Sequence, residues 1–306
     1  MSQMIVVPGL EVTPARLISS TLPAADYDAW SSTKSYAIGD RVTVDRINYE
    51  ALVVHTNRNP VSDTVTPAAW LNVGWINRYR MFNKQIGNTW AIGSFSSAAN
   101  EIDLLFRPGQ RVNAIGLVGV IASSIRVVMT QPGNETPIYD QTFVMTAPSG
   151  RGWYRHFFSP FSTRENLAVL DLPPASNADI RVTISAPGGT VRVGMMIIGW
   201  SRAIGTAVYD TSLGRKSYTT VKEEFDGSVT MTKHGARRQI TYRVVMRGDE
   251  VTDALRTLDP LDATAALYVG AEELDYTIIA GTYDDLDIGL PTFNHATYNL
   301  NVRSLM

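Results

Sequence analysis

The sequence predicts a mainly β protein: a small aromatic-rich β module, a jelly-roll-like β-sandwich, and a C-terminal β-rich domain with at most one short helix. Apolar residues occur in short runs rich in Val and Ile, which either alternate with polar residues or are continuous. The chain has 23 Gly and 15 Pro, and turn signals separate these runs at short intervals. Only Val251–Leu258 has a helical pattern, with acidic residues at its start and Pro260 beyond its end.

Length and composition exclude several classes of protein. The 306 residues suffice for two or three domains that each bury a core. The 27 Lys and Arg against 29 Asp and Glu leave a formal net charge of −2, so we expect no nucleic-acid partner. No apolar run is long enough to predict membrane insertion, and no signal peptide is recognisable. The absence of cysteine excludes disulfides, thiol nucleophiles and thiolate zinc sites.

Residues 1–25 are predicted to form an extended arm. They contain Pro8, Gly9, Pro14 and Pro23. Proline fixes φ and has no N–H donor, so such a segment suits a strap over a neighbouring surface better than a core strand. A disordered terminus is the alternative.

Residues 26–76 are predicted to form a compact aromatic β module. Asp40–Val44 alternates in polarity, Asp45–Arg46 forms a turn, and Asn48–His55 is the second strand. A domain this small needs aromatic area for its core, because each buried ring removes about 150–250 Å² from water. Some rings must therefore be core, and the exposed ones are candidates for sugar binding. The five candidate rings are Trp30, Tyr36, Tyr49, Trp70 and Trp75.

This module resembles the type-3 chitin-binding modules. Those begin with a Trp, continue through Tyr-x-x-Gly-Asp-x-Val and a Tyr-x-Ala strand, and close on a Trp. The matching residues are Trp30, Tyr36, Gly39, Asp40, Val42, Tyr49, Ala51 and Trp70. The resemblance implies a small β fold that binds carbohydrate through aromatic faces. Many members carry a Trp pair on the second strand, where this chain has Val53 and Val54. A structural module and a working lectin on this fold both stay open.

Residues 77–202 are predicted to form a β-sandwich. Val112–Ala122 is continuously apolar, as in a strand buried on both faces. Residues 180–185 and 191–193 alternate on either side of Pro187–Gly189, which predicts a hairpin. Frequent turn signals without helical segments favour antiparallel sheets. The arrangement is similar to galactose-binding-like jelly rolls.

Residues 203–306 are predicted to form a β-rich docking domain with divided charge. The first part, 203–247, has 8 basic and 4 acidic residues, a net charge of +4, whereas 248–306 has 2 basic and 11 acidic residues, a net charge of −9. Two solvated faces that pair within the domain would explain this pattern. Head-to-tail complementarity between copies is the alternative. The last strands are predicted at Thr264–Val269, Tyr276–Tyr283 and Thr297–Leu305.

Residues that could carry out chemistry are scattered. The four histidines lie far apart in the sequence: His55, His156, His234 and His295. No HExxH, GxSxG, P-loop or GxGxxG motif occurs. In Asp284-Asp285-x-Asp287, only Asp285 and Asp287 could share one face of a strand, which makes them weak Ca²⁺ candidates against a solvated turn. We therefore expect no enzymatic activity and no cofactor.

The order of the blocks resembles that of accessory tail proteins of tailed bacteriophages. Four segments are similar to minor tail or baseplate components: 73–90, 116–130, 191–205 and 266–305. The resemblance implies a virion structural protein of the tail tip or baseplate, made in the host cytoplasm. Its implied partners are other tail proteins, copies of itself and host cell-surface polysaccharide. The alternatives are a polysaccharide-binding lectin or receptor-binding protein, a head fibre or decoration protein, and a polysaccharide hydrolase.

Overall fold

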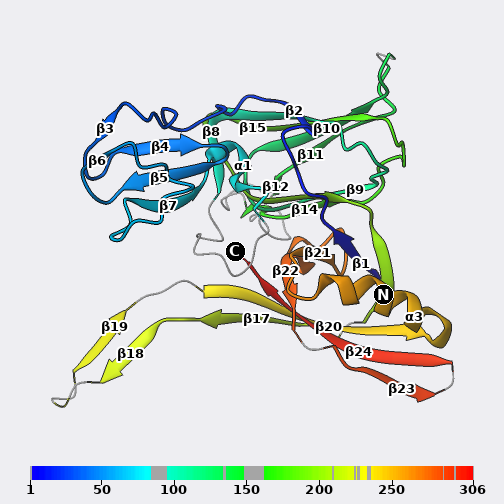
Figure 1. Ribbon diagram of the computed structural model, residues 1–306. Helices are drawn as coiled ribbons and strands as arrows, with labels where there is room; N and C mark the ends of the chain where they lie inside the picture. Colours follow the sequence, from blue (N-terminus) through cyan, green and yellow to red (C-terminus); the bar gives the residue numbers. More distant parts are fainter. Residues whose placement is uncertain are drawn as a thin grey trace, which may run out of the picture.

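The computed structural model describes most of the chain (Figure 1). The described residues are 2–83, 95–133, 136–147, 162–208, 210–223, 225, 228–232, 236–284, 286–292 and 294–305. Strands account for 55% of the structure and helices for 8%, which confirms the mainly β fold. Figure 1 shows a small module at one end, a sandwich beside it, a barrel below the sandwich, and a thin arm that extends from the barrel.

The small module has five short strands. These are β3 (Ser35–Tyr36), β4 (Arg41–Val44), β5 (Ile47–Ala51), β6 (His55–Thr56) and β7 (Trp70–Trp75). Strands β4, β5 and β7 form one antiparallel sheet, and β3 pairs with β6. The predicted turn at Asp45–Arg46 is confirmed: Val44 faces Ile47, and Asp45 adopts a φ of 55°. Asp tolerates this left-handed conformation better than most residues do.

Asp26 joins the module to the sandwich. Its carboxylate accepts hydrogen bonds from the Asn48 side chain at 2.8 Å and from the Asn77 backbone N–H at 3.0 Å. It also pairs with Arg80 at 3.1 Å. Asn77 begins the single-turn helix α1 (Asn77–Arg80), and its side chain bonds both backbone groups of Ser97. One carboxylate and one amide therefore form polar contacts between the two parts.

The sandwich contains a seven-stranded antiparallel assembly. Its strands are β2 (Leu17–Ser20), β8 (Ser96–Phe106), β9 (Ala114–Ile121), β10 (Ser124–Thr130), β11 (Tyr139–Val144), β14 (Leu167–Val169) and β15 (Asp179–Gly199). A separate pair is formed by β12 (Thr146–Ala147) and β13 (Ser162–Thr163). The first half of β15 pairs with β10 and its second half pairs with β9, so this one strand joins two parts of the assembly. The predicted buried strand in 112–122 is confirmed as β9.

The hairpin predicted at Pro187–Gly189 is wrong. The 21-residue strand β15 keeps its direction through this segment, and β8 runs antiparallel to both of its halves. The register shifts between Ala186 and Thr190, which marks a bulge. Gly188 has a φ of 72°, and its N–H donates to the side chain of Asn100. A bulge and a turn use the same Pro and Gly residues, so the local sequence does not distinguish them.

Five strands of the C-terminal part and the first strand of the chain close into a barrel. In ring order they are β16 (Arg202–Ala207), β1 (Ser2–Pro8), β21 (Ala266–Val269), β22 (Ile278–Tyr283), β24 (His295–Ser304) and β20 (Ala236–Arg247). The pairings of β20 with β24 and of β16 with β20 close the ring. Four strands lie outside it: β17 (Ser212–Ser217), β18 (Thr220–Glu223), β19 (Val229–Thr232) and β23 (Ile288–Thr292).

Helix α3 covers the barrel core. It spans Val251–Leu258, as the sequence predicts, and it buries Ala254 and Leu258. The short 3₁₀ helices η1 (Gly248–Glu250) and η2 (Asp259–Leu261) flank it, and η3 (Asp275–Thr277) precedes β22. Tyr242, Tyr268 and Tyr298 fill the barrel interior together with aliphatic side chains. The three last strands that the sequence predicts correspond to β21, β22 and β24.

Residues 1–25 do not form a separate arm. Their first strand, β1, is a barrel strand between β16 and β21, and β2 is an edge strand of the sandwich. Met4 and Val6 point into the barrel core, whereas Val7 packs in the interface with the sandwich. The prolines follow this apolar run rather than interrupt it, so they do not prevent a core strand.

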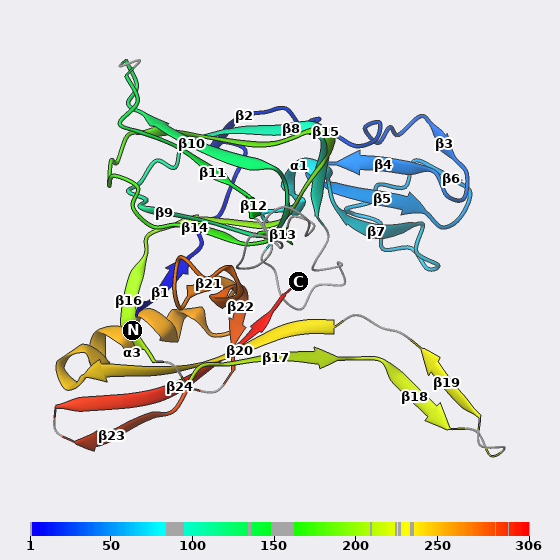
Figure 2. The same ribbon diagram turned by 180° about the vertical axis from the view of Figure 1, so that it is seen from behind.

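An apolar interface joins barrel and sandwich. Val118, Met195 and Ile197 of the sandwich pack against Leu267 and Val269 on the outer face of the barrel. All of these side chains are buried, and burial of such area at about 25 cal/mol per Å² stabilises the pairing of the two parts. Figure 2 shows the same stacking from behind. Among the described residues, no helix is long and apolar enough to cross a lipid bilayer.

Gly199→Ala is expected to destabilise this junction. An added Cβ would collide with the carbonyl oxygen of Pro8, and neither backbone can move without breaking strand pairing. We expect the free energy of unfolding to fall by about 1–3 kcal/mol. Gly214→Ala is the control, because its nearest new contact is ordinary at 3.6 Å, and it should change stability by less than about 0.5 kcal/mol. Equal thermal midpoints for the two variants in calorimetry would contradict this assignment.

Candidate functional site

The arm is the most exposed feature of the described structure. It consists of β17, the first residues of β20, and the distal hairpin of β18 and β19 (Figure 1). All residues of β17, β18 and β19 are exposed. An isolated two-stranded hairpin is marginally stable in water, because it has no second layer on which to bury apolar side chains. This arm is therefore a surface that a partner can complete.

The arm tip is amphipathic. Val221 lies opposite Met231 on one face, and Glu223 lies opposite Val229. The other face pairs Thr220 with Thr232 and Lys222 with Thr230. We use "arm tip" for the exposed apolar side chains, which are Val221, Phe225, Val229 and Met231. Exposed apolar groups gathered at one end of a projection are typical of a protein interaction site.

The arm base carries like charges directly opposite one another. Arg215 faces Arg238 across the two strands, and Lys216 faces Arg237. Such pairs are unfavourable unless other charges compensate them. Arg238 pairs with Glu165 of the sandwich at 2.8 Å. Within the described residues, no salt bridge connects Lys216, Arg237 or Arg215 to a carboxylate. The base is thus a positively charged ribbon.

Tyr218 lies beside this positively charged base. The Lys216 ammonium lies 5.8 Å from the ring centroid of Tyr218, and the Arg237 guanidinium lies 5.9 Å from it. A ring face attracts cations, so Tyr218 holds both side chains near one another despite their like charge. The basic groups are therefore kept together on the arm surface.

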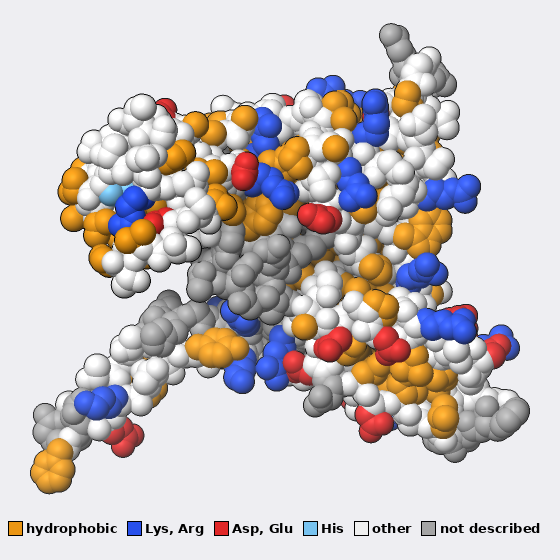
Figure 3. Space-filling model, in the orientation of Figure 1, with side chains coloured by type: hydrophobic (Ala, Val, Ile, Leu, Met, Phe, Trp, Pro, Cys, Tyr) orange, Lys and Arg blue, Asp and Glu red, His pale blue; other side chains and the backbone are white. Residues whose placement is uncertain are grey.

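An acidic groove lies on the barrel. Its volume is about 710 Å³. It is lined by Leu255, Asp259, Asp262, Tyr283, Asp284, Leu286, Asn301 and Arg303. Arg303 is paired with Asp284 at 2.8 Å, so the two remaining aspartates dominate the charge of the lining. Figure 3 shows acidic side chains around a hydrophobic patch on this part of the barrel.

Tyr283 lies beside the negative charges of the groove. Burial raises the pKa of its hydroxyl, and the nearby carboxylates of Asp262 and Asp259 raise this pKa further. The hydroxyl donates a hydrogen bond to the carbonyl oxygen of Leu258 at 3.1 Å. Leu255 and Leu286 supply apolar surface beside these acidic groups. The groove thus combines negative charge with two apolar side chains.

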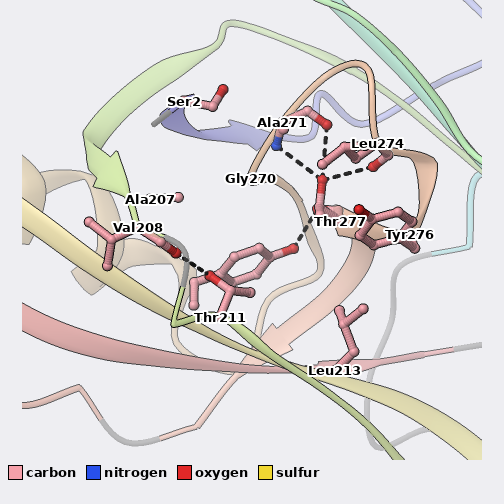
Figure 4. A pocket seen from close by; sticks show the side chains of 11 residues that line it. Ser2, Ala207, Val208, Thr211, Leu213, Gly270, Ala271, Leu274, Tyr276 and Thr277 are labelled. Atoms are coloured by element: carbon pink, nitrogen blue, oxygen red, sulfur yellow. Dashed lines mark hydrogen bonds between the residues drawn. The ribbon is translucent and has the colours of Figure 1, made fainter.

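A second cavity, of about 330 Å³, lies at the base of β17 and is shown in Figure 4. The Tyr242 hydroxyl donates to the carbonyl oxygen of Thr277 at 2.7 Å, and the Ala271 N–H donates to the Thr277 hydroxyl oxygen at 3.0 Å. Burial raises the pKa of Tyr242 well above its ordinary value. These contacts stabilise the loop before η3, so we assign no chemistry to this cavity.

The five rings proposed for carbohydrate binding lie mostly in the core of the small module. Tyr36, Tyr49 and Trp70 are buried, and Trp30 and Trp75 are partly buried against their neighbours. The rings of Tyr36 and Trp70 meet edge to face with centroids 5.0 Å apart. Together these rings do not form an exposed stacking platform. Val54 is exposed, but it offers no aromatic face.

The two Ca²⁺ candidates do not form a described site. Asp287 is exposed, and Asp285 lies outside the described residues. Among the described residues, no group of three or more His, Asp and Glu side chains is arranged to hold a metal. His55 is buried beside Trp70, and His295 is exposed. His156 and His234 lie outside the described residues.

The arm is not among the features predicted from the sequence. A signal is present, because the alternating residues 220–223 and 229–232 flank an Asp-Gly pair, which is a strong hairpin signal. The sequence predicts the basic character of this stretch, but not its exposure. A comparison with protein-family models and a search of curated protein sequences found no match to this chain.

Asp63 organises the long loop before β7. Burial would raise the pKa of its carboxyl, but the Arg58 guanidinium and the N–H groups of Ala69 and Val65 lower it below the ordinary value. Arg58 lies 2.7 Å from the carboxylate. The same loop carries the carbonyl oxygen of Arg58, which accepts a hydrogen bond from the Trp70 indole at 2.8 Å. The charged Asp63 thus fixes Arg58, whose carbonyl oxygen binds the buried Trp70 ring of the module core.

The stability of the small module is expected to fall in acid. Because the pKa of Asp63 is lower in the folded state, its stabilisation is present above the unfolded pKa of about 3.9 and is lost as pH falls below it. Asp63→Asn should lower the thermal midpoint at neutral pH and flatten its dependence on pH below about 4. Asp28→Asn, at a position that is 88% exposed, is the control. An unchanged acid slope in Asp63→Asn, followed by tryptophan fluorescence, would show that this carboxylate is not responsible.

Proposed function

We propose that this chain is a non-enzymatic structural protein that assembles through its arm, and that the assembly is the tail tip or baseplate of a tailed bacteriophage. The exposed, amphipathic arm is the observation that carries the proposal. The placement in a phage tail rests on the sequence resemblance described above.

Assembly would stabilise the arm. A two-stranded ribbon with apolar side chains at its tip and like charges at its base gains little from folding alone. The twelve-residue strand β20 holds it in place, because the second half of that strand is part of the barrel. Such a ribbon therefore adds little to the folding free energy of the monomer that presents it. Contact with another protein would bury the arm tip and compensate the basic base.

The small module is separate from the barrel that carries the arm. In both views it lies at the end of the sandwich away from the barrel, and the arm extends toward the same side of the molecule (Figures 1 and 2). A partner bound to the arm tip would therefore lie near this module. Contact with host polysaccharide through the module or the sandwich is the second part of the proposal. The five candidate rings are mostly buried, so other exposed groups would have to bind the polysaccharide.

The alternative functions are separable by experiment. A lectin or receptor-binding protein should bind envelope polysaccharide saturably on a glycan array, with or without its arm. A head fibre or decoration protein should be found with purified capsids rather than with tails. A structural tail protein should be present in purified tails at a fixed ratio to the other tail proteins.

Shortening the arm is expected to abolish incorporation into particles without unfolding the chain. Residues 218–235 would be replaced by Asn-Gly, since Ser217 and Ala236 already face each other at a position suited to a two-residue turn. The variant would be supplied in cells infected by a phage that lacks its own copy. We expect a thermal midpoint close to that of the wild type, and no chain in purified particles by mass spectrometry.

Two single substitutions of matched exposure refine this test. Met231→Ser changes an arm-tip residue that is 69% exposed, and Ile38→Ser changes a residue of the small module that is 70% exposed. Neither should affect folding, because neither side chain is part of a core. Met231→Ser should reduce incorporation while Ile38→Ser should not. Absence of the wild-type chain from purified particles would refute the proposed function.

A further inference from the structure

The arm and the acidic groove are complementary to each other. Residues 212–241, which include the arm, contain six basic and three acidic residues, a net charge of +3, and the positive charge lies at the arm base, at Arg215, Lys216, Arg237 and Arg238. Within the described part of the chain, Asp259 and Asp262 of the groove form no salt bridge with a basic side chain, and Leu255 and Leu286 are apolar side chains of the same lining. We propose that the arm of one copy docks in the acidic groove of a second copy. This inference rests on the proposed structural function and names the partner of the arm.

The match includes apolar surface as well as charge. The arm tip presents Val221, Val229 and Met231 on one face, with the fully exposed Phe225 beyond them. Leu255 is partly exposed at the groove, and Leu290 on the adjacent strand β23 is strongly exposed. Docking would remove these apolar side chains from water.

The arm does not reach the groove of its own chain. In Figures 1 and 2 the arm extends from one side of the barrel, whereas α3, which carries Leu255, lies toward the other side. The contact would therefore join different surfaces of two copies. Such a head-to-tail contact produces a ring when the rotation between copies closes, and a filament when it does not.

The opposite charges of the two surfaces favour a second copy over other occupants. A nucleic acid would be repelled by the acidic groove, and it would leave the apolar arm tip exposed. An uncharged glycan would leave Lys216 and Arg237 without compensation. A copy of this chain supplies apolar surface and acidic groups together. The charges should also steer the encounter, so self-association is expected to weaken as salt is added.

Cross-linking tests the contact directly, because the chain contains no cysteine. The double variant Met231→Cys, Leu255→Cys places one thiol on the arm tip and one in the groove. Treatment with a bismaleimide of short flexible spacer should produce a ladder of dimers, trimers and larger species. Each single variant can form only dimers. The control pair Met231→Cys, Ile38→Cys should give no ladder. Absence of a ladder in the first pair, or an equal ladder in the control pair, would overturn the inference.

Charge reversal provides a second, independent test. Asp259→Lys with Asp262→Lys should weaken self-association, measured by sedimentation, by about tenfold or more. Lys216→Glu with Arg237→Glu should do the same. A mixture of the two double variants should associate again, because the first variant keeps its basic arm and the second keeps its acidic groove, and the two reversed surfaces are also of opposite charge. Asp28→Lys on the small module is the control and should leave association unchanged. Failure of the mixture to associate would count against the assigned pairing.

These results distinguish the two proposals. Wild-type oligomers without a ladder between arm and groove would refute the docking mode and leave the structural function standing. A ladder in solution together with absence of the chain from purified particles would refute the proposed function and leave the docking mode standing. A wild-type chain that stays monomeric at every concentration reached would overturn the inference, and binding of the arm to a different protein would identify another occupant.

Discussion

Closure of the six-stranded barrel is the constraint on which the rest of the structure depends. A β-sheet leaves unpaired N–H and C=O groups at its edges, and closure removes those edges. Here the ring closes only because β1, at the start of the chain, lies between β16 and β21. The same strand brings Val7 to the apolar interface with the sandwich. One short strand therefore completes the barrel and positions the sandwich upon it.

Closure also explains why the arm exists as a separate feature. Strand β20 is longer than the barrel requires, so its first residues extend past the ring and pair only with β17. The barrel half of β20 contributes Tyr242 and Val244 to the core. The outer half therefore has a fixed direction even though its first residues pair only with β17. Rigidity at the base and exposure at the tip are what an assembly surface needs, because little conformational entropy is then lost on docking.

The small module illustrates the limits of a family resemblance. Its pattern of Trp, Tyr and Gly-Asp residues corresponds to a real compact β unit, and the turn at Asp45–Arg46 is where the sequence places it. In a unit this small, however, aromatic rings are the main source of buried area. Tyr36 and Trp70 are buried in this way, and the His55 ring packs against both of them. The same residue types that bind sugars when exposed are here part of the core.

The sequence by itself determined the features that depend on local periodicity. These are the mainly β fold, the buried strand in 112–122, helix α3 and the last strands of the chain, because side-chain alternation and turn residues act over a few neighbouring positions. Tertiary structure alone decided which strands pair. It placed β1 beside residues 202–207 and 266–269, made Pro187–Gly189 a bulge within β15, and left the arm uncovered. Pairing depends on contacts between segments far apart in the chain, and hydrophobic periodicity carries no information about which distant segment will be the partner.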